Sequence, residues 1–189
     1  MIYILAGHHS KDSGAVTTHP RLGIIKEADL TKELRDLVIR SLIDIEKIKD
    51  VKKDDDNKTL NEIIYGLREI SNKDLVVDIH FNAFNGKATG TEVIVPKIHS
   101  SIENALAAEL SESIASIMNI KNRGVKLENN TPRGRLGIFK GPGNRILVEV
   151  CFMDNDKEYE TYIINKYIIA AMIAQVINDR YVKKILELD

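Results

Sequence analysis

The chain has 189 residues, of which 43% are hydrophobic and 29% are charged, the length and balance of one medium-sized globular domain. Its 27 lysines and arginines nearly cancel its 28 aspartates and glutamates, so the net charge of -1 gives no general attraction to nucleic acid or to an anionic membrane. The single cysteine, Cys151, excludes an internal disulfide framework and fits synthesis in a reducing compartment.

The first predicted element is a strand over residues 2–6, in the opening stretch MIYILAGHHS. That apolar stretch is too short for the hydrophobic region of a signal peptide and has no basic residues before it. No run of the sequence approaches the roughly 20 apolar residues that a membrane span requires. We therefore expect a protein that is made in the cytoplasm without a signal peptide and does not insert into membranes.

Helical and strand-like spacings then alternate along the chain. Apolar residues recur at helical spacing over residues 27–46, with two acidic residues in the first turn. A short strand near 47–52 precedes the charged loop KKDDDNK, and a second helix is expected between Leu60 and Ile70. The run DLVVDIH, residues 74–80, is the predicted central strand.

The second half of the chain continues this alternation. The strand TEVIV is ended by Pro96, and a third helix is expected over 102–117. An irregular segment over about 127–144 is a candidate substrate-binding loop; the strand RILVEVCF and a long helix from about residue 155 follow it. This order predicts an α/β fold, a single three-layer domain over residues 1–189 with a twisted, mostly parallel central sheet and helices on both faces.

Three of the predicted strands carry residues that bind metals or move protons at or near their C-terminal ends. The first strand leads to His8, the central strand reaches His80, and the strand ILVEV contains Glu149. Ligands bind at this edge of the sheet in open α/β folds. If the three strands are parallel neighbours, these side chains converge, and Glu27 at the start of the first helix can reach the same point.

Two histidines and two glutamates can form a catalytic zinc centre. A catalytic zinc ion takes three protein ligands, and two histidines with one glutamate is a recurring set. Zinc lowers the pKa of water to about 7 and polarises a carbonyl group. A carboxylate outside the ligand set can accept a proton and pass it to the leaving nitrogen, so the four residues together suit amide hydrolysis.

Each of these residues also has a structural interpretation. His80 fits a hydrogen-bonded core histidine, His8 an exposed turn residue, and Glu27 a first-turn carboxylate that answers the helix dipole. Glu149 is harder to explain in this way, because a charge inside ILVEVCF is costly unless it is paired, protonated or bound to metal.

Four segments of the chain, in order and at their separations, resemble one known family: LAGHHSKDSGA, IKEADLTKEL, DIHFNAFNGKATGTEV and ILVEVCFMDNDKE. They are similar to the zinc-dependent N-acetylmuramoyl-L-alanine amidases of the type 3 group, which includes bacterial cell-wall amidases and phage endolysin catalytic domains. The resemblance implies hydrolysis of the amide between N-acetylmuramic acid and L-alanine in peptidoglycan. It also implies one Zn²⁺ per chain, with His8, Glu27 and His80 as ligands and Glu149 as the catalytic residue.

The chain departs from the family pattern at two places. His9 and Ser10 stand where Gly-Gly commonly follows the first ligand histidine, and isoleucines occupy the region of the second helix where an arginine is frequent. Neither departure removes a ligand or the catalytic glutamate.

Further residues have weaker signals. Asn82 is a candidate for binding the substrate amide, although an asparagine that closes a strand into a turn is an equal alternative. Arg133 and Arg135 are candidates for binding a stem-peptide carboxylate. His19 is expected at the surface. The resemblance implies peptidoglycan as the partner. The sequence shows no appended wall-binding repeat, so we expect no separate wall-binding domain. We expect the protein to reach the wall after release, in phage lysis or in lysis of a mother cell.

Two other classes of function compete with the amidase. A cysteine-dependent wall hydrolase would use Cys151 with His80 as its base, although nothing in the sequence places this thiol where its pKa would fall. A non-catalytic peptidoglycan-binding module would bind the wall without releasing new L-alanine amines.

Overall fold

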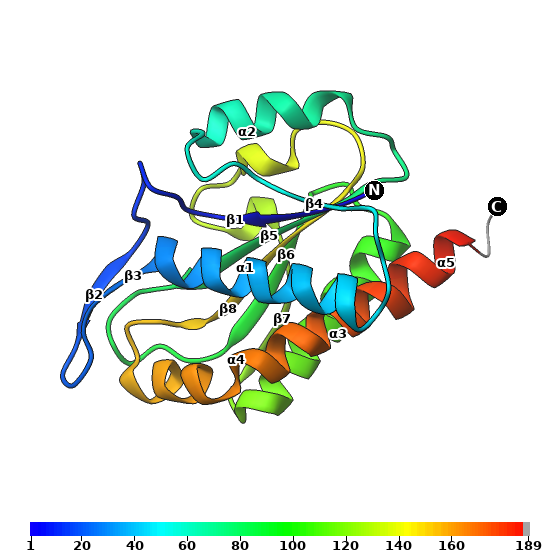
Figure 1. Cartoon of the computed structure of the whole chain (residues 1–189). Coiled ribbons are helices and arrows are strands. Elements are labelled where there is room, and N and C mark those ends of the chain that lie inside the picture. Colours follow the sequence, from blue (N-terminus) through cyan, green and yellow to red (C-terminus); the bar gives the residue numbers. More distant parts are fainter. Residues whose placement is uncertain (187–189) are drawn as a thin grey trace.

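The computed structural model describes residues 1–186 and confirms the predicted α/β fold (Figure 1). Its centre is a six-stranded sheet with the order β4-β1-β5-β8-β6-β7. The parallel strands are β1 (Ile2–Ala6), β4 (Val51–Lys53), β5 (Leu75–Asn82) and β8 (Asn144–Phe152). At the other edge, β6 (Thr91–Val95) runs antiparallel to β8 and parallel to β7 (Asn122–Leu127).

Helices cover both faces of this sheet, as predicted (Figure 1). One face packs against α1 (Glu27–Asp44), α3 (Ser101–Met118) and α4 (Asp156–Ile177), and this side holds the larger hydrophobic core. The other face packs against α2 (Leu60–Gly66) and the short 3₁₀ helices η1 (Leu67–Glu69) and η3 (Gly137–Phe139). The remaining helical turns are η2 (Glu128–Asn130), the π-helical turn η4 (Asn178–Val182) and α5 (Lys183–Leu186).

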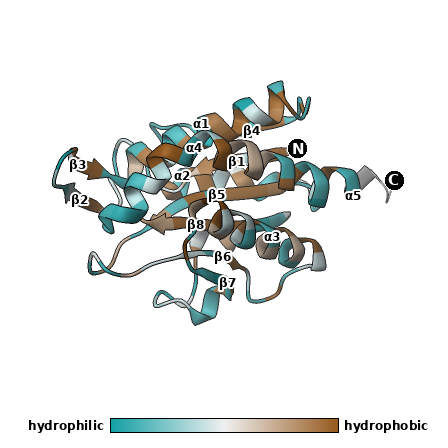
Figure 2. Cartoon of the chain, turned by 90° about the horizontal axis from the view of Figure 1, so that it is seen from below, coloured by the Kyte–Doolittle hydropathy of each residue, from teal (hydrophilic) through white to brown (hydrophobic). Residues whose placement is uncertain are grey.

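The central strand β5 is buried on both sides because helices cover both faces. Leu75, Val76, Val77 and Ile79 are all fully buried, which explains a continuous apolar run in place of an alternating pattern. Figure 2 shows this hydrophobic strand in the middle of the molecule. Among the helices that the structure describes, none has both the length and the apolar character needed to cross a membrane.

Some predicted elements needed correction. The sequence analysis missed the hairpin formed by β2 (Val16–His19) and β3 (Gly23–Lys26), and it missed β7, because these short strands are half exposed and carry few apolar residues. The second helix ends at Gly66 and continues only as a 3₁₀ turn.

His19, which we expected at the surface, is buried, so that expectation was wrong. Its Nδ1 accepts hydrogen bonds from the backbone N–H groups of Arg21 and Leu22, both at 3.2 Å. Its ring packs against that of Tyr159 with centroids 5.5 Å apart. The histidine therefore closes the hairpin turn and fixes it against α4.

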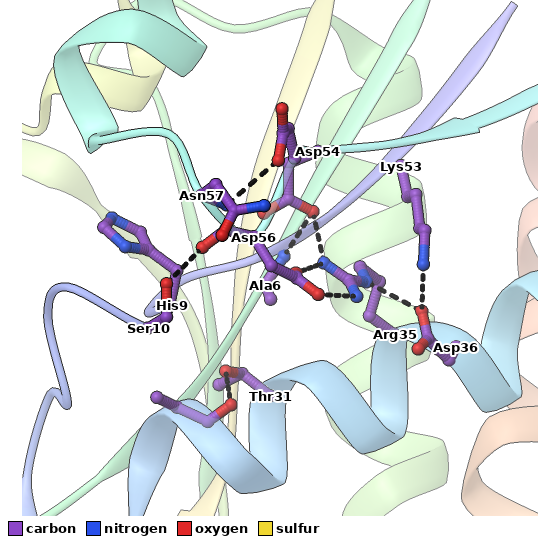
Figure 3. A network of polar contacts seen from close by, with 12 residues as sticks. Ala6, His9, Ser10, Thr31, Arg35, Asp36, Lys53, Asp54, Asp56 and Asn57 are labelled. Carbon is purple, nitrogen blue, oxygen red and sulfur yellow. Dashed lines mark hydrogen bonds and ion pairs between the residues drawn. The ribbon is translucent and has the colours of Figure 1, made fainter.

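A buried polar network joins α1 to the ends of β1 and β4 (Figure 3). Arg35 of α1 is fully buried, and its Nη1 donates to Asp54 Oδ1 at 2.9 Å and to Asp56 Oδ1 at 2.6 Å. Asp54 also accepts the backbone N–H of Ala6, and the Ser10 hydroxyl donates to the carbonyl oxygen of Asp56. The network thereby fastens both sides of the loop that follows β1.

We expect Arg35→Met to lower the free energy of unfolding by about 3–5 kcal/mol, because Asp54 would stay buried without its counter-ion. Urea titration followed by circular dichroism measures this change. Arg40→Met is the control, because Arg40 is exposed on the same helix and its loss should cost less than about 0.5 kcal/mol. Equal losses for the two variants would contradict a stabilising role for the network.

Candidate metal centre

His8, Glu27 and His80 converge on one point at the C-terminal edge of the parallel strands. His8 lies in the turn after β1, Glu27 is the first residue of α1, and His80 is near the end of β5. One ligand atom from each residue lies within 4.8 Å of the others. His8 Nε2 is 3.3 Å from Glu27 Oε2, and His80 Nδ1 is 3.1 Å from Glu27 Oε1.

Two backbone groups orient the Glu27 carboxylate. The N–H of Ala15 donates to Oε2 at 2.9 Å, and the N–H of Phe81 donates to Oε1 at 3.1 Å. Burial opposes ionisation here, but the hydrogen bond and charge of His80 outweigh it and lower the pKa of Glu27. Glu27 is therefore an ionised, fixed carboxylate, and the first-turn interpretation of this residue is incomplete.

Each histidine has a carboxylate on its outer nitrogen. His8 Nδ1 lies 3.1 Å from Asp12 Oδ2, and His80 Nε2 lies 3.2 Å from Asp78 Oδ2. Carboxylates in this position fix the ring orientation and tautomer of metal-binding histidines. His8 Nε2 and His80 Nδ1 are therefore the atoms turned toward the candidate metal position.

The sequence analysis missed Asp78, although a signal was present. Asp78 is a buried acidic residue within the apolar run of β5, two residues before His80 and so on the same face of the strand. Asp78 and Glu27 outweigh the effect of burial and raise the pKa of His80. The surroundings of this ring therefore favour positive charge.

Two glycines leave room for the histidine rings. A Cβ atom at Gly7 would lie 2.1 Å from His80 Nε2. A Cβ atom at Gly14 would lie 2.6 Å from both the His8 ring and Glu27 Oε2, and the backbone there has a φ of +62°. Any side chain at either position would displace a candidate ligand.

The arrangement fits a zinc ion. The three donor atoms lie within 4.8 Å of one another, and each Glu27 oxygen is 3.1–3.3 Å from one histidine nitrogen, so all three side chains can reach a single cation. The donors are two imidazole nitrogens and one carboxylate oxygen, a set that zinc takes in catalytic sites and that leaves one coordination position for a further ligand.

Glu149 stands beside this centre without belonging to the cluster of three donors. It pairs with His80 across the β5–β8 ladder and with Glu92 across the β8–β6 ladder. Burial raises the pKa of Glu149 to about 7, with His80 opposing the shift and the Glu27 and Glu92 carboxylates adding to it. A carboxyl group with a pKa near neutrality can both accept and donate a proton at neutral pH.

A cleft of about 690 Å³ contains this centre, a volume typical of small-molecule sites. Asn82 and Arg133 line the cleft, together with Glu149 and the three candidate ligands. Arg135 instead lines a neighbouring pocket beside Phe139 and is not part of this wall. The segment predicted as a substrate-binding loop thus contributes one of its two candidate arginines to the cleft.

His9, the bulky departure from the family pattern, is buried and is not among the residues that line the cleft. Its Nδ1 accepts the backbone N–H of Lys11 at 3.3 Å, and its backbone pairs with that of Asp12. The ring therefore closes the turn after His8, and Figure 3 shows His9 next to Ser10 beside the Arg35 network.

Cys151 is fully buried in the larger core and does not line the cleft. Burial, with added repulsion from Glu158 and Glu149, raises the pKa of its thiol well above the usual value. A nucleophilic cysteine needs access and a lowered pKa, so the structure disfavours the cysteine hydrolase.

Comparison with known proteins agrees with this geometry. The model of the N-acetylmuramoyl-L-alanine amidase family Amidase_3 matches residues 2–179. Among solved structures, the N-acetylmuramoyl-L-alanine amidase from Clostridium difficile 630 is 26% identical, with a TM-score of 0.70, and the match covers 98% of this chain and 96% of that chain.

Two other structures share the fold at 22% identity. The catalytic domain of the CD27L endolysin, which targets Clostridium difficile, has a TM-score of 0.71, with 95% of this chain and 97% of that chain covered. Cwp6 from Clostridium difficile has a TM-score of 0.76, but the chain spans only 29% of its length, with 95% of this chain covered. None of the curated proteins matches this chain.

We expect Asp78→Asn to weaken Zn²⁺ affinity about 10–100-fold, because the His80 ring would lose the carboxylate that holds it. Competition with a chromogenic chelator measures this affinity independently of activity. Asp29→Asn is the control. Asp29 is exposed in the first turn of α1, and this substitution removes the same charge as Asp78→Asn. Equal affinities for Asp78→Asn and the unmodified protein would show that His80 does not need Asp78.

In the metal-free protein, Glu149 should make stability fall as pH rises. Its pKa is about 7 in the folded state against an ordinary value of 4.5, so only the folded state keeps the proton between these values. The stabilisation is complete below about pH 4.5 and is lost as pH rises through about 7. Relative to Glu149→Gln, the unmodified protein should lose roughly 2–3 kcal/mol between pH 5 and 8. Urea titrations in EDTA measure this difference, and a constant difference would contradict the raised pKa.

Proposed function

We propose a catalytic role on the premise that this chain belongs to the N-acetylmuramoyl-L-alanine amidase family, whose model matches residues 2–179. The protein hydrolyses the amide between the lactyl group of N-acetylmuramic acid and L-alanine, and so separates the glycan of peptidoglycan from its stem peptides. The observation that carries this proposal is the convergence of His8, Glu27 and His80 beside Glu149 in one cleft.

We propose zinc as the metal at this centre, with one ion per chain. His8 Nε2, His80 Nδ1 and the Glu27 carboxylate would hold it, as the donor set and the proximity of these three side chains support. When bound, zinc supplies a Lewis acid that polarises the scissile carbonyl and lowers the pKa of water.

Glu149 is the proposed general base and acid. It accepts a proton from the attacking water and then delivers that proton to the amide nitrogen, which leaves as the amine of L-alanine. Its position supports this role, because Glu149 lines the cleft directly across the strand ladder from His80. A carboxyl with a pKa near 7 is suited to both steps, whereas an ordinary glutamate would be a poor acid at neutral pH.

The same cleft is the proposed binding site for the muramyl peptide. Asn82 lines the cleft and donates from Nδ2 to Glu92 Oε1 at 3.3 Å, and its side-chain oxygen is the proposed acceptor for a substrate amide N–H. Because the substrate lies outside the cytoplasmic membrane, we further propose that the protein meets it after release from the cell that makes it, as in phage lysis or mother-cell lysis.

We expect Glu149→Gln to keep its zinc and to lose hydrolysis by about 10²–10⁴-fold, because the variant retains the ligands but cannot transfer the proton. His80→Ala should lose both zinc and activity. Elemental analysis of the purified variants, combined with mass spectrometry of digested muropeptides, measures both properties. A zinc-free Glu149→Gln protein would overturn the division between ligands and base.

The unmodified protein provides the wider test of the function. Phenanthroline should abolish the release of L-alanine amines and added zinc should restore it, while iodoacetamide should have no effect. Binding to peptidoglycan without any such release would support the non-catalytic module in its place.

A further inference from the structure

A bulge in the edge strand β7 turns two basic side chains into the cleft. In the ladder with β6, Asn122 is opposite Thr91 and Gly124 is opposite Glu92, so Arg123 is an extra residue without a partner. Gly124 has a φ of +75°, the left-handed backbone that such bulges use. Arg123 and Lys126, three residues apart, would point to opposite faces in a regular strand, yet both line the cleft.

Arg123 is held in place by three contacts. Its Nε donates to Glu92 Oε2 at 2.8 Å, and its guanidinium lies over the Phe152 ring, 5.2 Å from the centroid. Its aliphatic stem passes so close to Gly90 that a Cβ atom there would lie 2.9 Å from Arg123 Cγ. Neither Nη atom has a hydrogen-bond partner among the described residues, so one edge of the guanidinium remains available to a ligand.

Two further cations line the cleft. Lys126 is half-buried on β7, and Arg133 belongs to the loop that follows. Within the described part of the chain, neither has an ion pair or a side-chain hydrogen bond. The cleft is thus lined by the acidic residues Glu27, Asp78 and Glu149 around the candidate metal position, and by three basic side chains from β7 and the loop that follows it.

We propose that Arg123, Lys126 and Arg133 form a subsite for the free α-carboxylate of the second residue of the stem peptide. This inference rests on the proposed function, because that function places the amide of L-alanine at the metal centre. The second stem residue is a glutamate joined through its γ-carboxyl group, which leaves its α-carboxyl group either free or amidated. A guanidinium edge with two nearby cations recognises the free carboxylate.

The dimensions of substrate and sheet agree. In an extended peptide, the scissile carbonyl carbon and this α-carboxylate lie about 7 Å apart, since neighbouring Cα atoms are about 3.8 Å apart. Glu149 is on β8, and Glu92, which binds Arg123, is opposite it on the neighbouring strand β6. Strand β7, which carries Arg123, is the next strand beyond β6. Strands lie about 4.8 Å apart, so the backbone of Arg123, two strands away, is about 10 Å from that of Glu149, a distance that the long Arg123 side chain shortens.

The test compares two substrates that share the scissile amide and differ only in this charge. They are N-acetylmuramoyl-L-alanyl-γ-D-glutamyl-L-lysine and the same compound with the α-carboxyl group amidated. The zinc-loaded protein should prefer the free acid by about tenfold or more in kcat/KM, the size expected of a charge-assisted hydrogen bond. In Arg123→Gln and Lys126→Gln this ratio should fall toward one.

Lys121→Gln is the matched control. Lys121 is exposed just before β7 and does not line the cleft, and this substitution removes the same charge as the test variants. Its substrate ratio should equal that of the unmodified protein. If Arg123→Gln does not fold, Lys126→Gln and Arg133→Gln carry the test.

Binding without turnover gives a second measurement. In a Glu149→Gln background, calorimetry with the two substrates should show tighter binding of the free acid, and this difference should shrink as salt is added. Equal use of both substrates by the unmodified protein, or an unchanged ratio in the variants, would overturn the subsite while leaving the amidase intact. Failure to cleave either substrate by folded, zinc-loaded protein would instead overturn the proposed function.

Discussion

The carboxylate of Glu27 is the contact on which the centre depends. It lies within 3.3 Å of both histidines and accepts one backbone N–H from Ala15 and another from Phe81, so it ties three separate parts of the chain to one point. Its own N–H donates to the carbonyl oxygen of Ala15, which fixes the start of α1. The buried carboxylates around the two imidazoles favour positive charge at this point, either on the His80 ring or on a bound cation.

Contacts outside the centre fix the segments that carry Glu27, His8 and His80. The buried Arg35 network fixes the loop after β1 from the side of β4, and the Thr31 hydroxyl, on the same helix, lies 3.4 Å from the His8 carbonyl oxygen. On the opposite side, the register between β5 and β8 sets His80 against Glu149. The candidate ligands and the proposed base thus lie on separate rigid elements, and their relative positions follow from sheet pairing and from buried ion pairs, both of which resist displacement.

The sequence predicted the sheet, the main helices and the four converging residues, because apolar spacing and strand-end polarity are local signals. The sequence did not predict contacts between residues that are far apart along the chain. The loop KKDDDNK was correctly predicted as a loop, but nothing local indicated that Asp54 and Asp56 neutralise a buried arginine 19 and 21 residues earlier. His19 was misplaced for the same reason, since its burial comes from Tyr159 on α4. Arg133 and Arg135 could not be separated by sequence, because only the path of the loop decides which one enters the cleft.

The reversal of direction at one edge of the sheet explains the composition of the cleft. In a purely parallel sheet only the C-terminal ends of strands reach the binding edge. Because β6 runs antiparallel to β8, its beginning lies at that edge, with Glu92 opposite Glu149. Strand β7 runs parallel to β6, so Arg123 also lies at its edge-facing start. A search of strand ends for polar residues finds His80 and Glu149 but passes over Arg123, whose position depends on the reversal and on the bulge at Gly124. The place of Arg123 in the cleft therefore follows from the topology of the sheet, whereas the places of His80 and Glu149 follow from the pattern at strand ends.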